Sequence, residues 1–375
     1  MTRPIWIVAA RRTVQGRFLG ALARHTATAL GVAAARAALN GMDPALIDSV
    51  VVGNVLSAGS GMNVARQIGM DAGLPVTTPA YTVNMMCASG MHAVMLAVQS
   101  IQSGAVRVVL CGGTESMSNA PYLLERARSG YKFGDGVLVD SMLRDGLTDA
   151  FSREHMGLTA EKIAALHGIS REAQDRFALA SQQRYAVAQA AGHFRDELVN
   201  VDKLDHDEHA RPETTLESLV SLKPVFNREG SVTAGNASGL NDGAAMLIVC
   251  DEARGREYGL KPLMIITGST VVGCEPSMMG MGPVYATRKL NHRPDEFDMI
   301  ELNEAFAAQA LACIQELGFD ESRVNPDGGA IALGHPIGAS GARLLVHLAH
   351  RRPKRGLATL CVGGGMGYAV VMEQP

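Results

Sequence analysis

The chain has 375 residues, of which 47% are hydrophobic and 19% are charged, and its formal net charge is -3 at pH 7. This composition is that of a globular protein large enough for two or more domains. It provides no overall basic field for nucleic acid, and no apolar run approaches the ~20 residues that span a bilayer. We therefore expect neither a nucleic-acid partner nor a membrane segment.

The six cysteines are scattered and form no Cys-x-x-Cys pair, which argues against a zinc site or a disulfide framework. The first residues enter a strand without a signal or transit peptide, and the last three are not a peroxisomal address. We expect a cytoplasmic protein that holds no metal.

The first part of the chain alternates strands with helices. We expect strands at 5–10, 49–52, 81–83 and 106–110, and helices at 26–39, near 63–70 and from 87 to about 103. Pro44 fits the first turn of a short helix. The alternation predicts an α/β domain with a mostly parallel sheet.

Residues 119–235 differ in character, with more charges, few strand candidates and helices near 154–167 and 171–191. We interpret them as a region inserted into the α/β domain. Strand character returns at 244–249, and a second α/β series begins at Leu263.

The two series resemble each other. The tripeptide at 88–90 recurs 251 positions later, the strand and glycines at 109–113 recur at an offset of 250, and Asn54 corresponds to Asn303 at an offset of 249. Any two α/β units share the sequence pattern of a strand, a glycine and a helix, but a nearly constant offset favours a duplication. We predict two similar halves that face each other, residues 1–118 (completed by 236–258) and 259–375, with 119–235 as an inserted loop domain.

Cys87 lies where the strand at 81–83 meets a run of helix formers. A thiol among the first residues of a helix meets unpaired N–H groups and the positive end of the helix dipole, which favour the thiolate. A buried structural cysteine is the plain alternative.

Three further motifs follow strands of the second half, where open α/β sheets place ligands. Asn303 and Glu304 open a helix after the strand at 298–302, His335 lies in a Gly-bounded turn before another helix, and Cys361 precedes a run rich in glycine. Taken singly, His335 and Cys361 could each be structural.

With these motifs, and with those at 112–117, 155–157 and 233–243, the chain resembles the thiolase family nearly end to end, in particular the short-chain, biosynthetic acetoacetyl-CoA thiolases. The resemblance implies a duplicated, layered α-β-α-β-α fold. It also implies an acetyl-CoA C-acetyltransferase of fatty acid metabolism, with coenzyme A as substrate and product and no cofactor.

The resemblance assigns catalytic roles to five residues. Cys87 would carry the acyl group, His335 would be its base, and Cys361 would move the proton at the α-carbon. Asn303 would hold a water that stabilises one oxyanion together with His335, and the N–H groups of Cys87 and Gly363 would stabilise the other. A helix N-terminus and a histidine together can bring a thiol pKa to ~4–7.

The resemblance also places a coenzyme A groove in the insertion. The residues that would line it are Leu147, His155, Met156, Arg211, Ser218, Ala234, Ser238 and Met279. His155 and Met156 could instead form a plain helix N-terminus, and Arg211 could be a surface ion pair. We expect His92 to be a packed or surface residue, and His206 and His209 to lie in a solvated loop without chemical function.

The chain is shorter than the family pattern at 201–212, 290–298 and 350–356. The first of these places the handling of the nucleotide end of coenzyme A in doubt, whereas the catalytic motifs are untouched. The resemblance further implies a homotetramer, a dimer of dimers, with its contact around residues 121–145.

Other classes of protein share parts of this pattern. A thiolase for longer or carboxylated 3-oxoacyl-CoA, such as 3-oxoadipyl-CoA, would share the catalytic residues. A decarboxylating ketosynthase would lack the second cysteine, and an acyl-CoA or lipid binding protein of this fold would be expected to have lost Cys87, His335 or Cys361. A dinucleotide oxidoreductase is excluded because no G-x-G-x-x-G follows the first strand.

Overall fold

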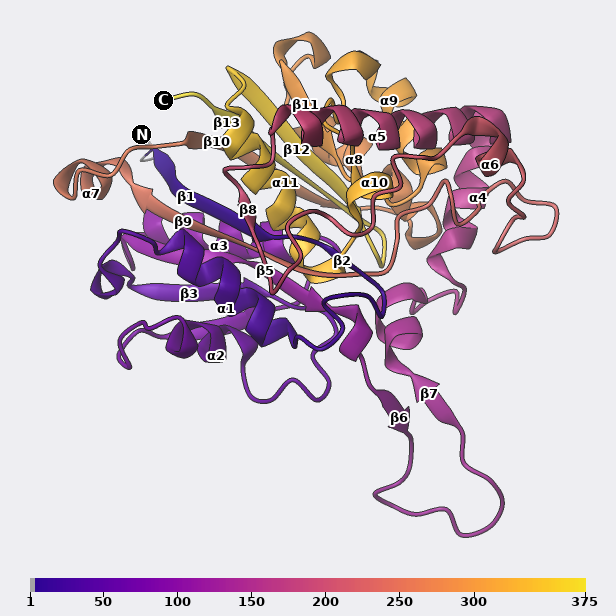
Figure 1. The fold of residues 1–375 in the computed structure, drawn as a ribbon, viewed down its shortest axis with the longest axis horizontal. Coiled ribbons are helices and arrows are strands. Elements are labelled where there is room, and N and C mark those ends of the chain that lie inside the picture. Colours follow the sequence, from indigo (N-terminus) through magenta and orange to yellow (C-terminus); the bar gives the residue numbers. More distant parts are fainter. Residues whose placement is uncertain (1–3) are drawn as a thin grey trace.

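The computed structural model describes residues 4–375, and its strands form one mixed sheet of eleven strands and a separate two-stranded hairpin (Figure 1). The strands of the large sheet are β1 (Ile5–Thr13), β2 (Gly16–Arg17), β3 (Ser49–Gly53), β4 (Ala80–Val83), β5 (Val108–Ser116), β8 (Leu198–Val199), β9 (Asn241–Asp251), β10 (Met264–Gly273), β11 (Met299–Leu302), β12 (Arg355–Val362) and β13 (Met366–Glu373). The hairpin consists of β6 (Tyr122–Leu124) and β7 (Leu138–Asp140).

The helices are arranged in layers on both faces of this sheet (Figure 1). They are α1 (Ala27–Ala38), α2 (Val64–Asp71), α3 (Ser89–Gln102), α4 (Met156–His167), α5 (Arg171–Ala191), α6 (Leu216–Val220), α7 (Glu252–Glu257), α8 (Gly282–Lys289), α9 (Ala307–Leu317), α10 (Ala330–Leu333) and α11 (Ile337–Arg351). The predicted helices near 63–70, 154–167 and 171–191 and the short helix at Pro44 are therefore confirmed.

Alternate residues of each strand face different cores, because successive side chains of a strand point to opposite sides. In β5, Val109 and Cys111 pack with α3 and α11, whereas Val108 and Leu110 pack with α1 and α2. Strands of the second half share the α3–α11 core, and their other faces pack with α8 and α9. The two halves of the sheet thus form two β layers, with α3 and α11 packed between them and the other helices on the outer faces. This confirms the α-β-α-β-α layering.

The two halves have the same strand order. The first half runs β1-β9-β5-β3-β4, and the second runs β10-β13-β12-β11, followed by a bridge between Ile300 and Val324 in the place of the fifth strand. Hydrogen bonds between β1 and β10 join the halves into one sheet. The domain boundaries given above stay predictions.

The sheet is not mostly parallel, so that prediction was wrong. In each half the last strand, β9 or β13, enters between two earlier strands and runs antiparallel to both. Hydrophobic periodicity reports which face of a strand is buried, and it carries no information on strand direction.

Helices α3 and α11, which correspond to each other in the duplication, cross at small residues. A Cβ on Gly90 would lie 2.9 Å from the Cβ of Ala342, and a Cβ on Gly341 would lie 2.7 Å from that of Met91. Glycine therefore permits the close contact, which brings the turn before α3 next to the turn before α11. These two turns carry Cys87 and His335.

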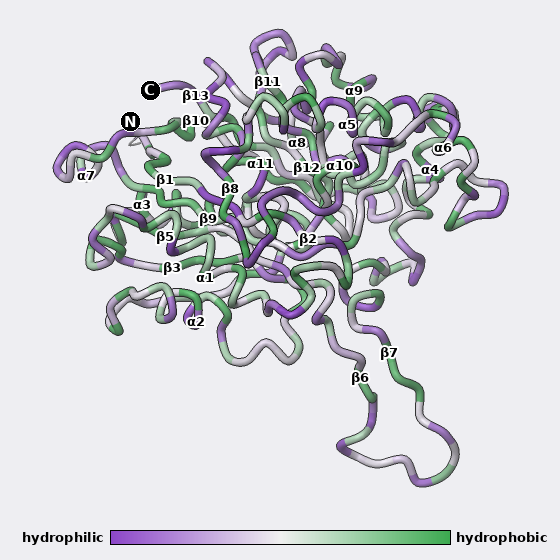
Figure 2. The backbone as a smooth tube through the Cα atoms, viewed as in Figure 1, coloured by the Kyte–Doolittle hydropathy of each residue, from purple (hydrophilic) through white to green (hydrophobic). Residues whose placement is uncertain are grey.

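The inserted region has two parts. Helices α4, α5 and α6 lie against the second half, whereas the hairpin β6–β7 projects away from the body (Figure 1). Figure 2 shows hydrophobic residues on both arms of this hairpin, where Tyr122, Leu124 and Leu138 are exposed. None of the helices in residues 4–375 is both long and apolar enough to cross a bilayer.

Candidate active site

A cavity of about 400 Å³ opens between the two halves and the insertion. Cys87, His335 and Cys361 all line it, although they lie far apart in the sequence. Most other lining residues are apolar, among them Met117, Leu240, Met279 and Phe306. The structure therefore brings the predicted nucleophile, base and second thiol to one site.

Cys87 occupies a tight turn between β4 and α3. The preceding residue, Met86, has a φ of 47°, in the left-handed region that non-glycine residues rarely adopt. The Ser89 hydroxyl holds this turn by donating to the Met86 carbonyl (2.7 Å) and accepting from the Met85 N–H (2.8 Å). The sequence predicted Cys87 among the first residues of the helix. The helix begins only at Ser89, so Cys87 precedes it.

The Cys87 thiol is a weak acid in this environment. Burial raises its pKa to about 11, Glu115 adds to the effect, and a hydrogen bond from the Gly363 N–H to the thiol opposes it. The expected lowering of the Cys87 pKa was wrong, because desolvation outweighs the backbone N–H donors. The predicted nucleophile is therefore present as a thiol.

His335, the predicted base, has a defined tautomer. The Ser340 hydroxyl donates to the Pro336 carbonyl (2.9 Å), so its oxygen is left to accept from Nδ1 of His335 at 2.5 Å. This assigns the hydrogen to Nδ1 and leaves the lone pair on Nε2. Burial, assisted by Arg343, lowers the His335 pKa to about 4, so the ring is neutral.

A buried carboxylate connects the turns around the site. Glu115, at the end of β5, accepts hydrogen bonds from the N–H groups of Val55 and Leu56 after β3 and from the N–H of Gly338 at the start of α11. It also accepts from the Asn54 amide at 2.8 Å. Burial raises the Glu115 pKa to about 7. Glu115 is thus a positioning residue for the turn that carries His335.

Cys361 lies near the end of β12, as predicted. It is buried, and desolvation together with the nearby Cys87 raises its pKa well above the usual value, so it is a thiol. Gly363 follows it and lies beside Met86 and Met156 in an adjoining hollow. A Cβ at 363 would require the Met156 methyl group to move.

Asn303 differs from the prediction in two ways. It lies in a loop before α9, which begins only at Ala307, and it does not line the cavity. Its N–H donates to the carbonyl of Thr359, two residues before Cys361. Within residues 4–375, its buried side-chain amide has no hydrogen-bond partner at either end. Buried amides are almost always paired with protein groups or with ordered water.

Most residues predicted to bind coenzyme A line the same cavity. They are Leu147, His155, Met156, Arg211, Ala234, Ser238 and Met279. Ser218 lies instead in a neighbouring groove, where its hydroxyl caps α6 together with Thr215. His155 caps α4 by accepting from the Gly157 N–H (3.0 Å), as the plain interpretation predicted, and it also stacks on Phe226 and lines the cavity. Its role in coenzyme A binding stays a prediction.

Of three other histidines, two lie as predicted and one does not. His92 lies outside the cavity, 3.3 Å from the Tyr368 hydroxyl, and His206 is an exposed neighbour of Asp205, both as expected. His209 was wrongly placed in solvent, since it is packed against Gly239 and lines the cavity. Gly239 lies 30 positions further along the chain, so no local pattern indicates this contact.

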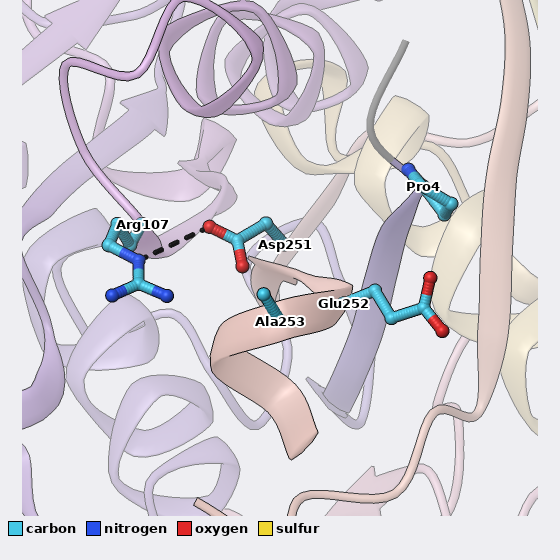
Figure 3. Close-up of a pocket in the computed structure, with 5 residues that line it drawn as sticks. All are labelled: Pro4, Arg107, Asp251, Glu252 and Ala253. Atoms are coloured by element: carbon cyan, nitrogen blue, oxygen red, sulfur yellow. Dashed lines mark hydrogen bonds and ion pairs between the residues drawn. The ribbon is translucent and has the colours of Figure 1, made fainter. Parts of the chain in front are cut away.

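A second hollow, at the surface, lacks the thiols and the histidine of this cavity. This hollow is lined by Pro4, Arg107, Asp251, Glu252 and Ala253 and contains an ion pair, between Arg107 and Asp251, and no cysteine or histidine (Figure 3). In the part of the chain that the structure describes, no three His, Cys, Asp or Glu side chains are grouped so that they could hold a metal ion.

Comparisons with known proteins show the family. The family models for the thiolase N-terminal and C-terminal domains match residues 5–253 and 260–374. The acetyl-CoA acetyltransferase of Chromobacterium violaceum is 51% identical to this chain and covers 98% of it and 99% of its own length.

Two solved structures have the same fold over the whole chain. The human mitochondrial 3-ketoacyl-CoA thiolase in complex with CoA superimposes with a TM-score of 0.97 at 45% identity, covering 100% of this chain and 98% of its own. The Bacillus anthracis acetyl-CoA acetyltransferase gives 0.96 at 40% identity, with 99% of both chains covered. The chain therefore belongs to the thiolase family and is an acyltransferase.

Proposed function

We propose that the protein is an acetyl-CoA C-acetyltransferase, which interconverts acetoacetyl-CoA plus CoA with two molecules of acetyl-CoA. The observation that carries the proposal is the presence of two thiols, Cys87 and Cys361, and a neutral histidine, His335, in one mostly apolar cavity. Relatives such as the Chromobacterium violaceum protein bear the name of this activity. Coenzyme A is substrate and product, and the chemistry that we propose requires no cofactor.

In the direction of thiolysis, Cys87 gives its proton to His335 and its sulfur attacks the 3-oxo carbonyl. The bond between the carbonyl carbon and the α-carbon breaks, and the electron pair left on the α-carbon takes the proton of Cys361. Acetyl-CoA leaves, and Cys87 carries the acetyl group. The raised pKa values of both thiols are consistent with these starting protonation states.

The second half-reaction regenerates the enzyme. The sulfur of CoA attacks the acetyl-Cys87 thioester, and the bond to the Cys87 sulfur breaks. The protons of CoA and of His335 then restore both thiols. The N–H groups of Cys87 and Gly363 stabilise one oxyanion, and a water held by the unpartnered Asn303 amide stabilises the other together with His335. Condensation is the same sequence in reverse.

The space around Cys361 supports a short acyl chain. Met156, Met279 and Phe306 pack with Cys361 in one buried cluster, and Phe226 lies against it. Each extra methylene must displace part of this cluster, and overpacking typically costs ~1–3 kcal/mol.

Steady-state thiolysis of a graded series of 3-oxoacyl-CoAs tests this proposal. We expect kcat/KM to fall at least about tenfold between acetoacetyl-CoA and 3-oxooctanoyl-CoA, because apolar pockets discriminate by ~1–3 kcal/mol per methylene. The name of the human structure favours the second candidate, a 3-ketoacyl-CoA thiolase. A kcat/KM that increases with chain length, or that is highest for 3-oxoadipyl-CoA, would contradict the proposal and indicate a longer or carboxylated substrate.

We also propose a homotetramer built as a dimer of dimers. Strand β4 lies at one edge of the large sheet, where β3 is its only partner among the described residues. The hairpin β6–β7, with exposed Tyr122, Leu124 and Leu138, projects from the body. Light scattering should give the mass of four chains, and replacing residues 124–138 by a short turn should reduce it to two. A monomeric wild type, or a shortened variant that is still tetrameric, would contradict this assembly.

The reducing cytoplasm remains our proposal for the compartment. It is supported by the state of the cysteines, all six of which are free. Recovery of the protein from a membrane-enclosed, oxidising fraction of its host would contradict it.

A further inference from the structure

The segment 207–211 lies where the cavity meets a neighbouring surface groove. His209, Arg211 and Ala234 line both spaces, whereas Cys87 lines only the cavity and Ser218 only the groove. These shared residues therefore lie at the boundary between the two spaces, which we call the neck. A ligand that extends from the groove to Cys87 would cross this boundary.

The segment is anchored on the side before His209. The carboxylate of Asp207 is buried and accepts from both terminal nitrogens of Arg12, at 2.7 and 2.9 Å, and from the N–H of Gln15 at 2.8 Å. The next carboxylate, Glu208, accepts from the N–H groups of Arg17 and Ala21. A bidentate buried ion pair fixes both position and orientation.

The other side is anchored as well. The Arg211 N–H donates to the side-chain oxygen of Gln182 at 2.8 Å. Between the two anchors, the His209 ring lies on Gly239 and fills the space that a Cβ there would need. The imidazole is therefore held in the neck by the fold, although the surrounding sequence is that of a polar loop.

The ring is neutral and has no partner within the chain. Burial and the neighbouring Arg211 lower the pKa of His209 to about 4. Among residues 4–375, no side chain or backbone group forms a hydrogen bond with either ring nitrogen. A neutral imidazole offers one donor and one acceptor, which matches the N–H and C=O of a secondary amide.

We propose that His209 binds the pantetheine arm of the acyl-CoA and forms a hydrogen bond with the amide that lies farther from the thioester. This inference rests on the proposed function. The thioester must reach Cys87 at the inner end, and the exposed cation of Arg211 at the neck suits the phosphates outside. The outer amide then crosses the neck, where apolar walls make an unpaired amide unfavourable.

Replacement of His209 by Leu and by Gln, with two thioester substrates, tests this role. S-Acetoacetyl-N-acetylcysteamine keeps the amide nearer the thioester and lacks the outer one, whereas acetoacetyl-CoA has both. We expect His209→Leu to raise KM for acetoacetyl-CoA about three- to tenfold with kcat unchanged, the size of one lost hydrogen bond. KM for the truncated thioester should stay as in the wild type, and His209→Gln should recover most of the affinity for acetoacetyl-CoA.

Two further variants control the experiment. His206→Leu changes an exposed histidine of the same loop and should change neither KM. Gly239→Ala adds the Cβ that displaces the His209 ring, so it should repeat the effect of His209→Leu even if that variant does not fold.

Equal changes with both substrates, no change with acetoacetyl-CoA, or failure of Gln to rescue would each overturn the assignment. Calorimetric titration with CoA alone separates this inference from the proposed function. A wild type that binds CoA but turns over neither thioester would refute the function, whereas an unchanged Kd for CoA in His209→Leu would refute the role of His209.

Discussion

Replacing Cys87 by Ala is expected to abolish acyl transfer, with a loss of kcat of about 10⁴-fold or more, because no acyl-enzyme can form without the nucleophile. In the wild type, brief treatment with acetyl-CoA should leave one acetyl group on this residue, which peptide mass spectrometry can locate. The fold should persist, since Ala fills most of the space of a buried cysteine.

Cys274→Ala is the matched control for this experiment, because Cys274 is half-buried and does not line the cavity. It should be acetylated at Cys87 as the wild type is. A label on another residue, or wild-type turnover in Cys87→Ala, would show that the nucleophile has been assigned wrongly.

Replacing Cys361 by Ala should separate the two half-reactions. The nucleophile, its turn and His335 remain, so the variant should still be acetylated by acetyl-CoA and should still exchange the acetyl group with free CoA. Condensation and thiolysis require a proton to move at carbon, and a positioned acid or base typically contributes ~10²–10⁴-fold. We expect both rates to fall by at least that factor.

Deuterium exchange from solvent into the methyl group of acetyl-CoA gives a second measurement on the same variant. It should disappear with Cys361 because no other group is assigned to that proton. If Cys361 only packs against Met156 and Met279 at the strand end, both half-reactions will fall together or hardly change. Methyl exchange at the wild-type rate would also refute its role.

The sequence alone determined most of the secondary structure and the identity of the reacting groups. Pro44 in its short helix acts through its own backbone neighbours, so local pattern suffices for it. Cys87, His335 and Cys361 could be named because each lies in a continuous motif of the family. The duplication was visible as a nearly constant offset, and both halves have the same strand order.

Tertiary structure decided the properties that depend on distant neighbours. The directions of β9 and β13 follow from where each strand re-enters the sheet, which periodicity does not encode. The neutral state of Cys87 follows from desolvation by the surrounding chain, an effect that exceeds that of the backbone N–H donors. His209 lies in the neck because Arg12 holds Asp207 and Gly239 leaves room for the ring. Burial and long-range contact are sums over residues far apart in the chain, so a local pattern does not contain them.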